Sequence, residues 1–412
     1  MKYGSLFFAA ALWSLPAMGA ADSAPDAVEE FFSAPAIEDI RLTFATGGWE
    51  TLRERYLEND WYKADFEWRS ISLRNIGVRS RGSGSRNPVK PGVRLEFGKY
   101  ESGQNFLGIP RLELKNAVQD PSMLKEHVSM RLYRTMGMPA PRTIHVRLFV
   151  NGEYAGLYTA VEPINTYFLK RQFGEATGFL YDYAWADPYF FEYVGPDPAL
   201  YVPARFDPAT RAGEQDPAVL VEMIRLMNEA PDEEFAGRIG EYVDMEGFLR
   251  YVAVENYLAD LDGVLGEFGM ANFYIYRLDG STQFRWIAWD KDRTFSDVSR
   301  SIFHNFERNV LLRRAMATPR FREAYLTALH AVADTAGGVG GWLEWEILRT
   351  YFRVEDAAYA DERKQCPPEQ SLFDNPGACS FDDFHGSVAR MAQFARERYG
   401  IVKDRAEASA IR

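Results

Sequence analysis

A change of sequence pattern near Phe173 constrains the fold of this chain more than any other feature. Before it, short segments alternate apolar and polar residues as half-buried strands do. The clearest is 143–150, which is followed by the hairpin turn Asn151-Gly152. After it comes an aromatic- and proline-rich loop at 180–215, and then patterns of helical length at 217–229, 244–258, 319–333, 341–359 and 384–399. The sequence therefore predicts an α+β fold, with a β-rich lobe at 37–173 and a mainly helical lobe at 174–412.

The first 21 residues have the pattern of a secretory signal peptide, 1–21: a lysine, a short apolar run and small residues at the cleavage position. Residues 22–36 are expected to be a mobile lead-in segment. No later stretch reaches the roughly 18–20 apolar residues of a membrane-spanning helix. We expect an exported chain, periplasmic or extracellular, without a transmembrane segment. In such an oxidising compartment Cys366 and Cys379 would form a disulfide.

The net charge of the chain limits the classes of molecule that it is expected to bind. A net charge of -12 argues against general binding to nucleic acid or anionic membranes. Basic residues nevertheless gather at Arg79, Arg81, Arg86, Lys90 and Arg94. This cluster indicates a small anionic ligand, and the alternative is a solvated strand edge.

The segment 260–292 contains the side chains that phosphoryl transfer needs, in a suitable order. Asp262 comes first, Asn272 precedes a predicted hairpin, and Asp290 and Asp292 follow that hairpin. Phosphoryl-transfer enzymes use one carboxylate to take the proton of the attacking hydroxyl, and an Asn and an Asp to hold a metal ion. The hairpin would fold Asn272 and Asp290 back toward each other. The alternative is an ordinary turn after a strand.

Several motifs, in order along the chain, resemble the CotH-like (spore coat protein H) atypical protein kinase family. They are Gly77-Val-Arg79-Ser-Arg81-Gly82, Leu114-Lys-Asn116, Asn151-Gly-Glu-Tyr-Ala-Gly156, Asp262-Gly263, Asn272-Phe-Tyr-Ile-Tyr276 and Trp289-Asp-Lys-Asp292. The resemblance covers roughly residues 35 to 340. It implies a two-lobed atypical kinase fold, with ATP as the phosphate donor and a Ser/Thr hydroxyl of a secreted or envelope protein as the acceptor.

The nucleotide contacts are assigned mainly to the first lobe. A glycine-rich run allows the backbone and hydroxyls to approach phosphate, although it could also be an ordinary turn. Glu126 is expected to position a phosphate-binding lysine, on a helix predicted to begin at Asp120. The full set of candidates is Arg79, Arg81, Ser83, Ser85, Lys90, Glu126 and Glu162, with Lys90 on the α/β phosphates and Glu162 near the ribose or base.

The catalytic and metal residues are assigned to the second lobe. By resemblance Asp262 is the catalytic base, and Asn272 and Asp290 ligate Mg2+ or Mn2+, with Asp292 as a further ligand or a helix cap. Asp262 and Asn272 are ten positions apart, whereas ordinary protein kinases separate these residues by about five. Ser296 also stands where the family often has glycine.

Two alternatives remain from the sequence. The first is a catalytically silent kinase-like fold for adhesion or surface binding, with the aromatics between Tyr181 and Tyr201 as a ligand surface if they are exposed. The second is a phosphotransferase acting on a sugar or another small hydroxyl compound. Nucleotide binding would separate the silent protein from the enzymes.

Overall fold

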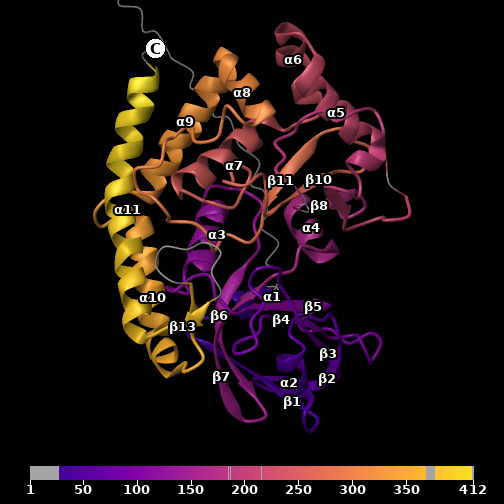
Figure 1. Ribbon diagram of the computed structural model, residues 1–412, viewed down its shortest axis with the longest axis vertical. Helices are drawn as coiled ribbons and strands as arrows, with labels where there is room; N and C mark the ends of the chain where they lie inside the picture. The colour runs from indigo at the N-terminus through magenta and orange to yellow at the C-terminus, as the bar shows by residue number, and fades with distance from the viewer. Residues whose placement is uncertain (1–26, 184, 186, 215, 368–375, 411–412) are drawn as a thin grey trace, which may run out of the picture.

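The computed structural model describes residues 27–183, 185, 187–214, 216–367 and 376–410. The predicted signal peptide, 1–21, lies outside these residues. The chain forms two lobes, a β-barrel at the indigo end of the colour scale and a mainly helical lobe that begins in magenta (Figure 1). This is the α+β organisation that the sequence predicts.

Seven strands close the first lobe into a barrel in the order β1-β2-β3-β4-β5-β7-β6. Strand β1 lies parallel to β6, and this pairing closes the barrel. Leu112 and Leu114 of β5 point into its core, so Arg111, Glu113 and Lys115 lie on the opposite face of that strand. The bounds are β1 Glu38–Phe44, β2 Tyr62–Trp68, β3 Ile71–Ser80, β4 Val93–Glu96, β5 Arg111–Lys115, β6 Thr143–Val150 and β7 Glu153–Val161.

The expected lead-in segment is in part a structural element. Residues Ala27–Phe32 form helix α1, and its Val28 and Phe31 are fully buried in the barrel core. The prediction of a mobile segment is therefore wrong for this part, because the apolar side chains among its small residues supply core contacts. Helix α2, Gly48–Glu54, follows β1.

Helix α3 begins later than predicted. It spans Lys125–Thr135, whereas the sequence predicted a start at Asp120. The Asp120 carboxylate accepts hydrogen bonds from the backbone N–H groups of Ser122 and Lys125, at 2.9 Å each. The aspartate thus closes a turn ahead of the helix, where its side chain satisfies backbone donors.

The second lobe contains a four-stranded sheet in the order β11-β10-β8-β9. Its strands are β8 Phe179–Tyr183, β9 Phe206–Pro208, β10 Phe273–Arg277 and β11 Phe284–Ala288. Strands β8 and β9 fall in the segment that was predicted to be a loop. Their aromatic side chains fill the core, since Tyr181, Tyr189 and Tyr201 are all buried. The condition set for an aromatic ligand surface, that these side chains be exposed, is met by Trp185, which is 55% exposed, and not by the buried tyrosines.

Helices cover this sheet and extend the lobe. They are α4 Thr166–Phe173, η1 Pro198–Leu200, α5 Ala218–Glu229, α6 Asp232–Arg238, η2 Ile239–Glu241, α7 Met245–Tyr257, α8 Val310–Ala317, α9 Pro319–Ala336, α10 Trp342–Ala360 and α11 Phe381–Ala410. The five predicted helices correspond to α5, α7, α9, α10 and α11. Among the residues that the model describes, no helix is both long and apolar enough to cross a membrane.

The C-terminal segment connects the two lobes. Helix α10 contacts β7 and α3 of the first lobe as well as α9 of the second. The short hairpin of β12 (Gln365–Cys366) and β13 (Gly377–Ala378) then leads into α11, which runs along α9 and α10 (Figure 1). Cys366 and Cys379 form the predicted disulfide across this hairpin.

Candidate active site

Lys115 joins the two lobes at the centre of the site. It is the last residue of β5, on the face that points away from the barrel core. Its ammonium lies 2.8 Å from Glu126 Oε1 on α3 and 2.7 Å from Asp290 Oδ1 in the second lobe. The structure thus gives Glu126 a lysine partner, as expected from the sequence, but that lysine is Lys115.

Glu126 also holds the strand end that carries Asp290. Its Oε2 accepts a hydrogen bond of 2.6 Å from the backbone N–H of Lys291. The side chain of Glu126 is buried, so both of its oxygens are used within the protein. One carboxylate therefore fixes the position of the lysine and of the acidic segment together.

The hairpin of β10 and β11 brings Asn272 and Asp290 to the same end of the sheet, as predicted. Phe273 pairs with Ala288, and the two polar residues flank this last pair. Asn272 Nδ2 donates to the backbone oxygen of Asp262 at 2.9 Å and to its Oδ2 at 2.8 Å. The amide nitrogen is thus turned to Asp262, which leaves Asn272 Oδ1 as the atom for a cation.

A buried ionic group supports the loop that carries Asp262. Lys291 Nζ is fully buried and lies 2.9 Å from Asp260 and 3.4 Å from Glu255. Glu255 also accepts the backbone N–H of Leu265 at 2.7 Å. A Cβ on Gly263 would lie 2.4 Å from this carboxylate. The residue after Asp262 must therefore be glycine for the loop to pack against Glu255.

The electrostatics of the site favour an added cation. Burial opposes ionisation of Asp290, but Lys115 and Arg81 outweigh it and lower the pKa of its carboxyl. Burial and the charge of Asp290 raise the pKa of Asp292 to about 8. Burial, with Asp260 and Asp290, also raises the pKa of Asp262. Carboxylates outnumber the nearby cations, and hard oxygen donors of this kind suit Mg2+ or Mn2+.

The glycine-rich run forms the connection between β3 and β4. Gly82 has a φ of 107°, and a Cβ there would lie 2.4 Å from Ser85 Oγ. Asn116 Nδ2 donates to the backbone oxygen of Ser85 at 2.9 Å, which ties the run to the residue after Lys115. Ser83 is exposed at the tip of the run. The run therefore folds back beside β5, with its hydroxyls near the surface.

Arginines line the same face of the barrel as Lys115. Arg81 and Arg94 lie 2.8 and 2.7 Å from the two carboxylate oxygens of Glu113. The Arg79 guanidinium lies over the ring of Trp61, 5.0 Å from its centroid. Of the predicted basic cluster, Arg81 acts on the charge of Asp290, whereas Arg86 donates to the backbone oxygens of Tyr56 and Glu58.

Lys90 and Glu162 are placed differently from their predicted roles. Lys90 lies in the loop before β4 and is fully buried, with its ammonium 2.6 Å from Asp361. Glu162 is also fully buried, and its two oxygens lie 2.9 Å from Arg142 and 2.7 Å from Arg171. The structure does not bring either group to the cluster around Lys115, and each is held by its own ion pairs instead.

Sequence reasoning missed Lys115 as the lysine of the site, although it noted the motif around it. The available signal was the position of Lys115 at the end of the strand immediately before the helix of Glu126. It also missed Asp182 on β8, which accepts a hydrogen bond of 2.9 Å from the Tyr274 hydroxyl. Burial raises the pKa of Asp182 to about 6. This carboxyl was hidden within the predicted loop.

Comparison with known proteins identifies relatives of this chain. Residues 78–337 match the family described as CotH kinase protein. The inner spore coat protein H of Bacillus subtilis (strain 168) is 24% identical over 301 residues, which cover 71% of this chain and 80% of that protein. The invasin CotH7 of Rhizopus delemar is 26% identical over 207 residues, 49% of this chain but 33% of the fungal protein. A solved structure, the Helicobacter pylori proinflammatory kinase CtkA, is 11% identical with a TM-score of 0.30, over 78% of this chain and 94% of that one.

Proposed function

The chain belongs to the CotH kinase protein family, and from this premise we propose that it is an atypical protein kinase. It would transfer the γ-phosphoryl group of ATP to a Ser or Thr hydroxyl of an exported protein. The observation that carries the proposal is the bridge from Lys115 to both Glu126 and Asp290. A lysine held by a helix carboxylate and facing a metal-binding aspartate is the arrangement that kinases require for phosphoryl transfer.

In this proposal the donor nucleotide lies between the barrel face of Lys115 and the acidic end of the hairpin. Lys115 and Arg81 would neutralise phosphate oxygens, and the backbone and hydroxyls of Ser83 and Ser85 would cover them. Asn272 Oδ1 and Asp290 would hold Mg2+ or Mn2+. The bound ion supplies positive charge that stabilises the transferring group. Asp292 is a further oxygen donor in the same segment.

Asp262 would orient the acceptor hydroxyl and take its proton. Its Oδ2 accepts the amide of Asn272, so its other oxygen remains to meet the hydroxyl. The raised pKa of Asp262, caused first by burial, increases its basicity toward that proton. The protein would also contribute to catalysis by positioning Asp262. The contacts of Gly263 and Lys291 hold the loop that carries Asp262 in place before the substrates bind.

Export of the protein is part of the proposal. It is supported by the predicted signal peptide and by the Cys366–Cys379 disulfide, since structural disulfides persist in oxidising compartments. The spore-coat name of the Bacillus relative is in keeping with an acceptor protein outside the cytoplasm. The partners would then be a nucleotide and a protein, and the charge of -12 disfavours nucleic acid.

The adhesion alternative has less support because most of its aromatic residues are buried, with Trp185 as the exposed one. A phosphotransferase acting on a sugar or another small hydroxyl compound uses the same donor site and differs in the acceptor alone. The invasin name belongs to a fungal relative of which this chain matches one third. The kinase is therefore the preferred proposal.

The test is transfer of label from γ-labelled ATP, with Mg2+ and separately with Mn2+, by the wild type and Asp290→Asn. We expect labelled protein with the wild type and a loss of at least about 10³-fold with the variant. Asp279→Asn is the matched control, because it removes an exposed carboxylate at the far end of the same hairpin. If the wild type transfers no phosphate and gains no thermal stability from ATP with metal, the silent protein replaces the kinase.

A further inference from the structure

An exposed row of aromatic residues runs along α10, the helix that contacts both lobes. Trp345, Phe352 and Tyr359 are 68, 70 and 71% exposed. They follow one another at intervals of seven positions, and we call these three residues the heptad stripe. Helix α10 begins after the family match, which ends at residue 337. None of the three residues takes part in the proposed donor or catalytic site, so the kinase function does not account for their exposure.

The spacing of the heptad stripe makes it straight and narrow. Residues seven positions apart lie about 10.5 Å apart along a helix axis and drift by only about 20° around it. The stripe is therefore roughly 21 Å long on one side of α10. The other sides of the helix pack on α3, β7, α9 and α11. A repeat of seven residues is the spacing by which one helix packs along another.

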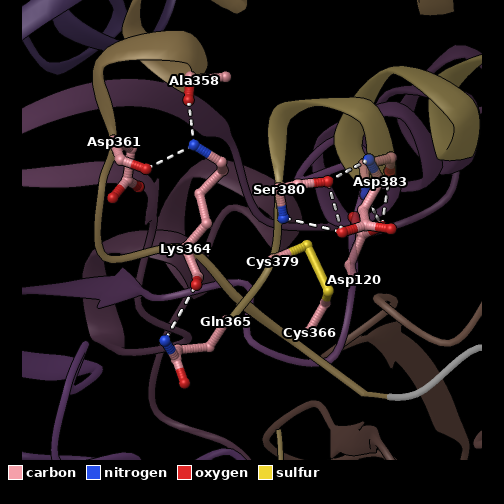
Figure 2. The surroundings of a disulfide bond; sticks show 10 residues. Asp120, Ala358, Asp361, Lys364, Gln365, Cys366, Cys379, Ser380 and Asp383 are labelled. Atoms are coloured by element: carbon pink, nitrogen blue, oxygen red, sulfur yellow. Dashed lines mark hydrogen bonds between the residues drawn. A yellow bond between two sulfur atoms is a disulfide. The ribbon is translucent and has the colours of Figure 1, made fainter. Parts of the chain in front are cut away.

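Both ends of α10 are fixed to the rest of the chain. At the first turn, Glu344 accepts a hydrogen bond of 2.7 Å from Arg396 Nε of α11. At the last turn, the Lys364 ammonium donates to the backbone oxygen of Ala358 at 2.8 Å, in the surroundings of the disulfide that Figure 2 shows. The helix thus holds its exposed face in place before a partner binds, which reduces the ordering cost of association.

The exposed area of the stripe is of the size that a small interface needs. Aromatic side chains bury about 150–250 Å² each, so the exposed parts of these three provide roughly 400 Å². Patches of this size on a single chain are often functional. Two such stripes in contact would bury roughly 800 Å² before the flanking residues are added, which corresponds to a specific interface at the small end of the range.

The stripe is symmetric about Phe352. Trp345 lies seven positions before it and Tyr359 seven positions after it. Arg349 and Asp356 are also exposed on this side of the helix, three positions before and four positions after Phe352. A two-fold axis at Phe352 would align two antiparallel copies of α10, with Trp345 of each copy beside Tyr359 of the other. Arg349 would then lie within one position of the level of Asp356 in the other copy.

The two halves of this helix face carry charges of opposite sign. Glu346 lies 2.8 Å from Arg349 and 2.9 Å from Arg131. One carboxylate thus serves two guanidinium groups, and the first half keeps an excess of positive charge. In the second half Glu355 and Asp356 are both acidic. A copy turned about the two-fold axis brings the acidic half of one helix to the basic half of the other, whereas a parallel copy would align charges of the same sign.

We propose that the heptad stripe is a dimer interface, on which a second copy of this chain binds with its α10 antiparallel to the first. The occupant is a second copy because the aromatic residues and the charges are complementary to themselves about Phe352. The interface is independent of the proposed kinase function, and the experiment that tests it needs no nucleotide.

The experiment is sedimentation equilibrium of the full chain at about 1 to 100 µM, a range suited to the weak affinity of a small interface. We expect dimers at the upper end of this range. Phe352→Glu brings two carboxylates together at the axis and should raise the Kd of the dimer at least about 100-fold. Leu57→Glu is the control, because Leu57 is 65% exposed on the barrel lobe; its Kd should stay within twofold of the wild type. If Phe352→Glu does not fold, Trp345→Ser replaces it and should raise the Kd at least tenfold.

Arg349→Asp and Asp356→Arg test the antiparallel arrangement. Each change alone aligns charges of the same sign across the pair and should raise the Kd at least fivefold. The double variant exchanges the two charges and should return the Kd to within twofold of the wild type. Glu346 keeps Arg131 as its partner in all of these variants. A parallel pair aligns each residue with its own copy in every variant, so it predicts no such recovery.

Three results would overturn the proposal: a wild type that stays monomeric, a dimer that neither Phe352→Glu nor Trp345→Ser weakens, or charge variants without recovery in the double variant. A monomer that binds insoluble polysaccharide through Phe352 would also overturn it and would assign the stripe to a carbohydrate. Because none of these measurements depends on phosphate transfer, failure of the dimer and failure of the kinase proposal can be distinguished.

Discussion

Two groups of buried charged residues in this molecule contain a lysine from the barrel lobe. They differ in the balance of positive and negative charges and in their exposure to solvent. The cleft cluster consists of Lys115 with Glu126, Asp290 and Asp292. We call the second group the C-terminal brace. It consists of the contacts that helix α10, together with Asp361 just after it, makes with the first lobe. The main contact is the ion pair Lys90–Asp361. Asp290 keeps 30% of its side chain exposed, whereas Lys90 and Asp361 keep none.

The comparison shows what separates a functional lysine from a structural one. In the brace one ammonium meets one carboxylate, and the backbone N–H groups of Leu157 and Arg363 also donate to Asp361, at 3.0 and 2.9 Å. In the cleft cluster three carboxylates, those of Glu126, Asp290 and Asp292, face Lys115 and Arg81, and Arg81 is already paired with Glu113. The first group is complete within the protein, and the second is incomplete until a cation arrives.

The largest effect should follow from Lys115→Met. We expect the rate of phosphate transfer to fall about 10³-fold, equivalent to about 4 kcal/mol, because the phosphate oxygens lose their fixed cation. Single-turnover transfer from labelled ATP measures this. Lys90→Met is the matched comparison, and an equal loss of rate in folded Lys90→Met protein would contradict the division of roles between the two lysines.

Lys90→Met should instead destabilise the fold. Asp361 would be left buried without its partner, a change that typically costs about 3 to 4 kcal/mol. Chemical denaturation monitored by tryptophan fluorescence gives the free energy of unfolding. A variant as stable as the wild type would show that the brace does not hold the lobes together.

Acid should destabilise the fold through His145, a buried residue of β6. Burial, with Arg353 nearby, lowers the pKa of His145 to about 4, despite its hydrogen bond to the backbone oxygen of Met123. Between about pH 6.5 and 4 the unfolded chain binds a proton here that the folded chain does not bind. The free energy of unfolding should therefore fall by roughly 3 kcal/mol as the pH falls through this range.

Denaturation curves of the wild type and His145→Gln at pH 7 and pH 4.5 isolate this contribution from that of the carboxylates. The variant should lose less stability on acidification than the wild type. His330→Gln, which removes an imidazole from α9, is the control. Equal losses in all three proteins would contradict the assignment.

The smallest effect concerns repair of the brace. Adding Asp361→Asn to Lys90→Met removes the unpaired charge and keeps an acceptor for Leu157, so the double variant should regain about 2 kcal/mol over the single one. A complete double-mutant cycle measures this coupling. No recovery would mean that Lys90 acts through packing against the Tyr158 ring, which lies 5.2 Å away.

The fold could be predicted where the sequence pattern is local. The hairpin after Val150 and the five long helices follow from alternation, turns and helical spacing. Strands β8 and β9 could not be recognised, because their aromatic residues pack on all sides and show no alternation. The turn closed by Asp120 also escaped prediction, since its side chain fits a helix cap and a turn equally well in sequence.

The site, like the fold, could be predicted from the sequence only where its residues are connected by a local pattern. Asn272 and Asp290 were predicted to lie together because a single hairpin connects them, and Asp262 was added by resemblance. The choice of Lys90 over Lys115 depended on a partner 271 positions away, Asp361, which no local pattern reveals. Glu162 was misplaced for a similar reason, since its partner Arg171 lies on the following helix. Charge in a sequence indicates a ligand or an internal partner, and the fold alone distinguishes them.

The distance along the chain between Lys90 and Asp361 also separates the times at which these two partners are synthesised. At about 5–20 residues per second, 271 residues take roughly 14 to 54 s to synthesise. Once β7 has been made, the barrel has its strands but still lacks the carboxylate that pairs with Lys90. A nascent chain therefore carries a hydrated lysine where the finished protein has a dry ion pair. The late arrival of Asp361 means that a residue after α10 closes an ion pair begun in the loop before β4.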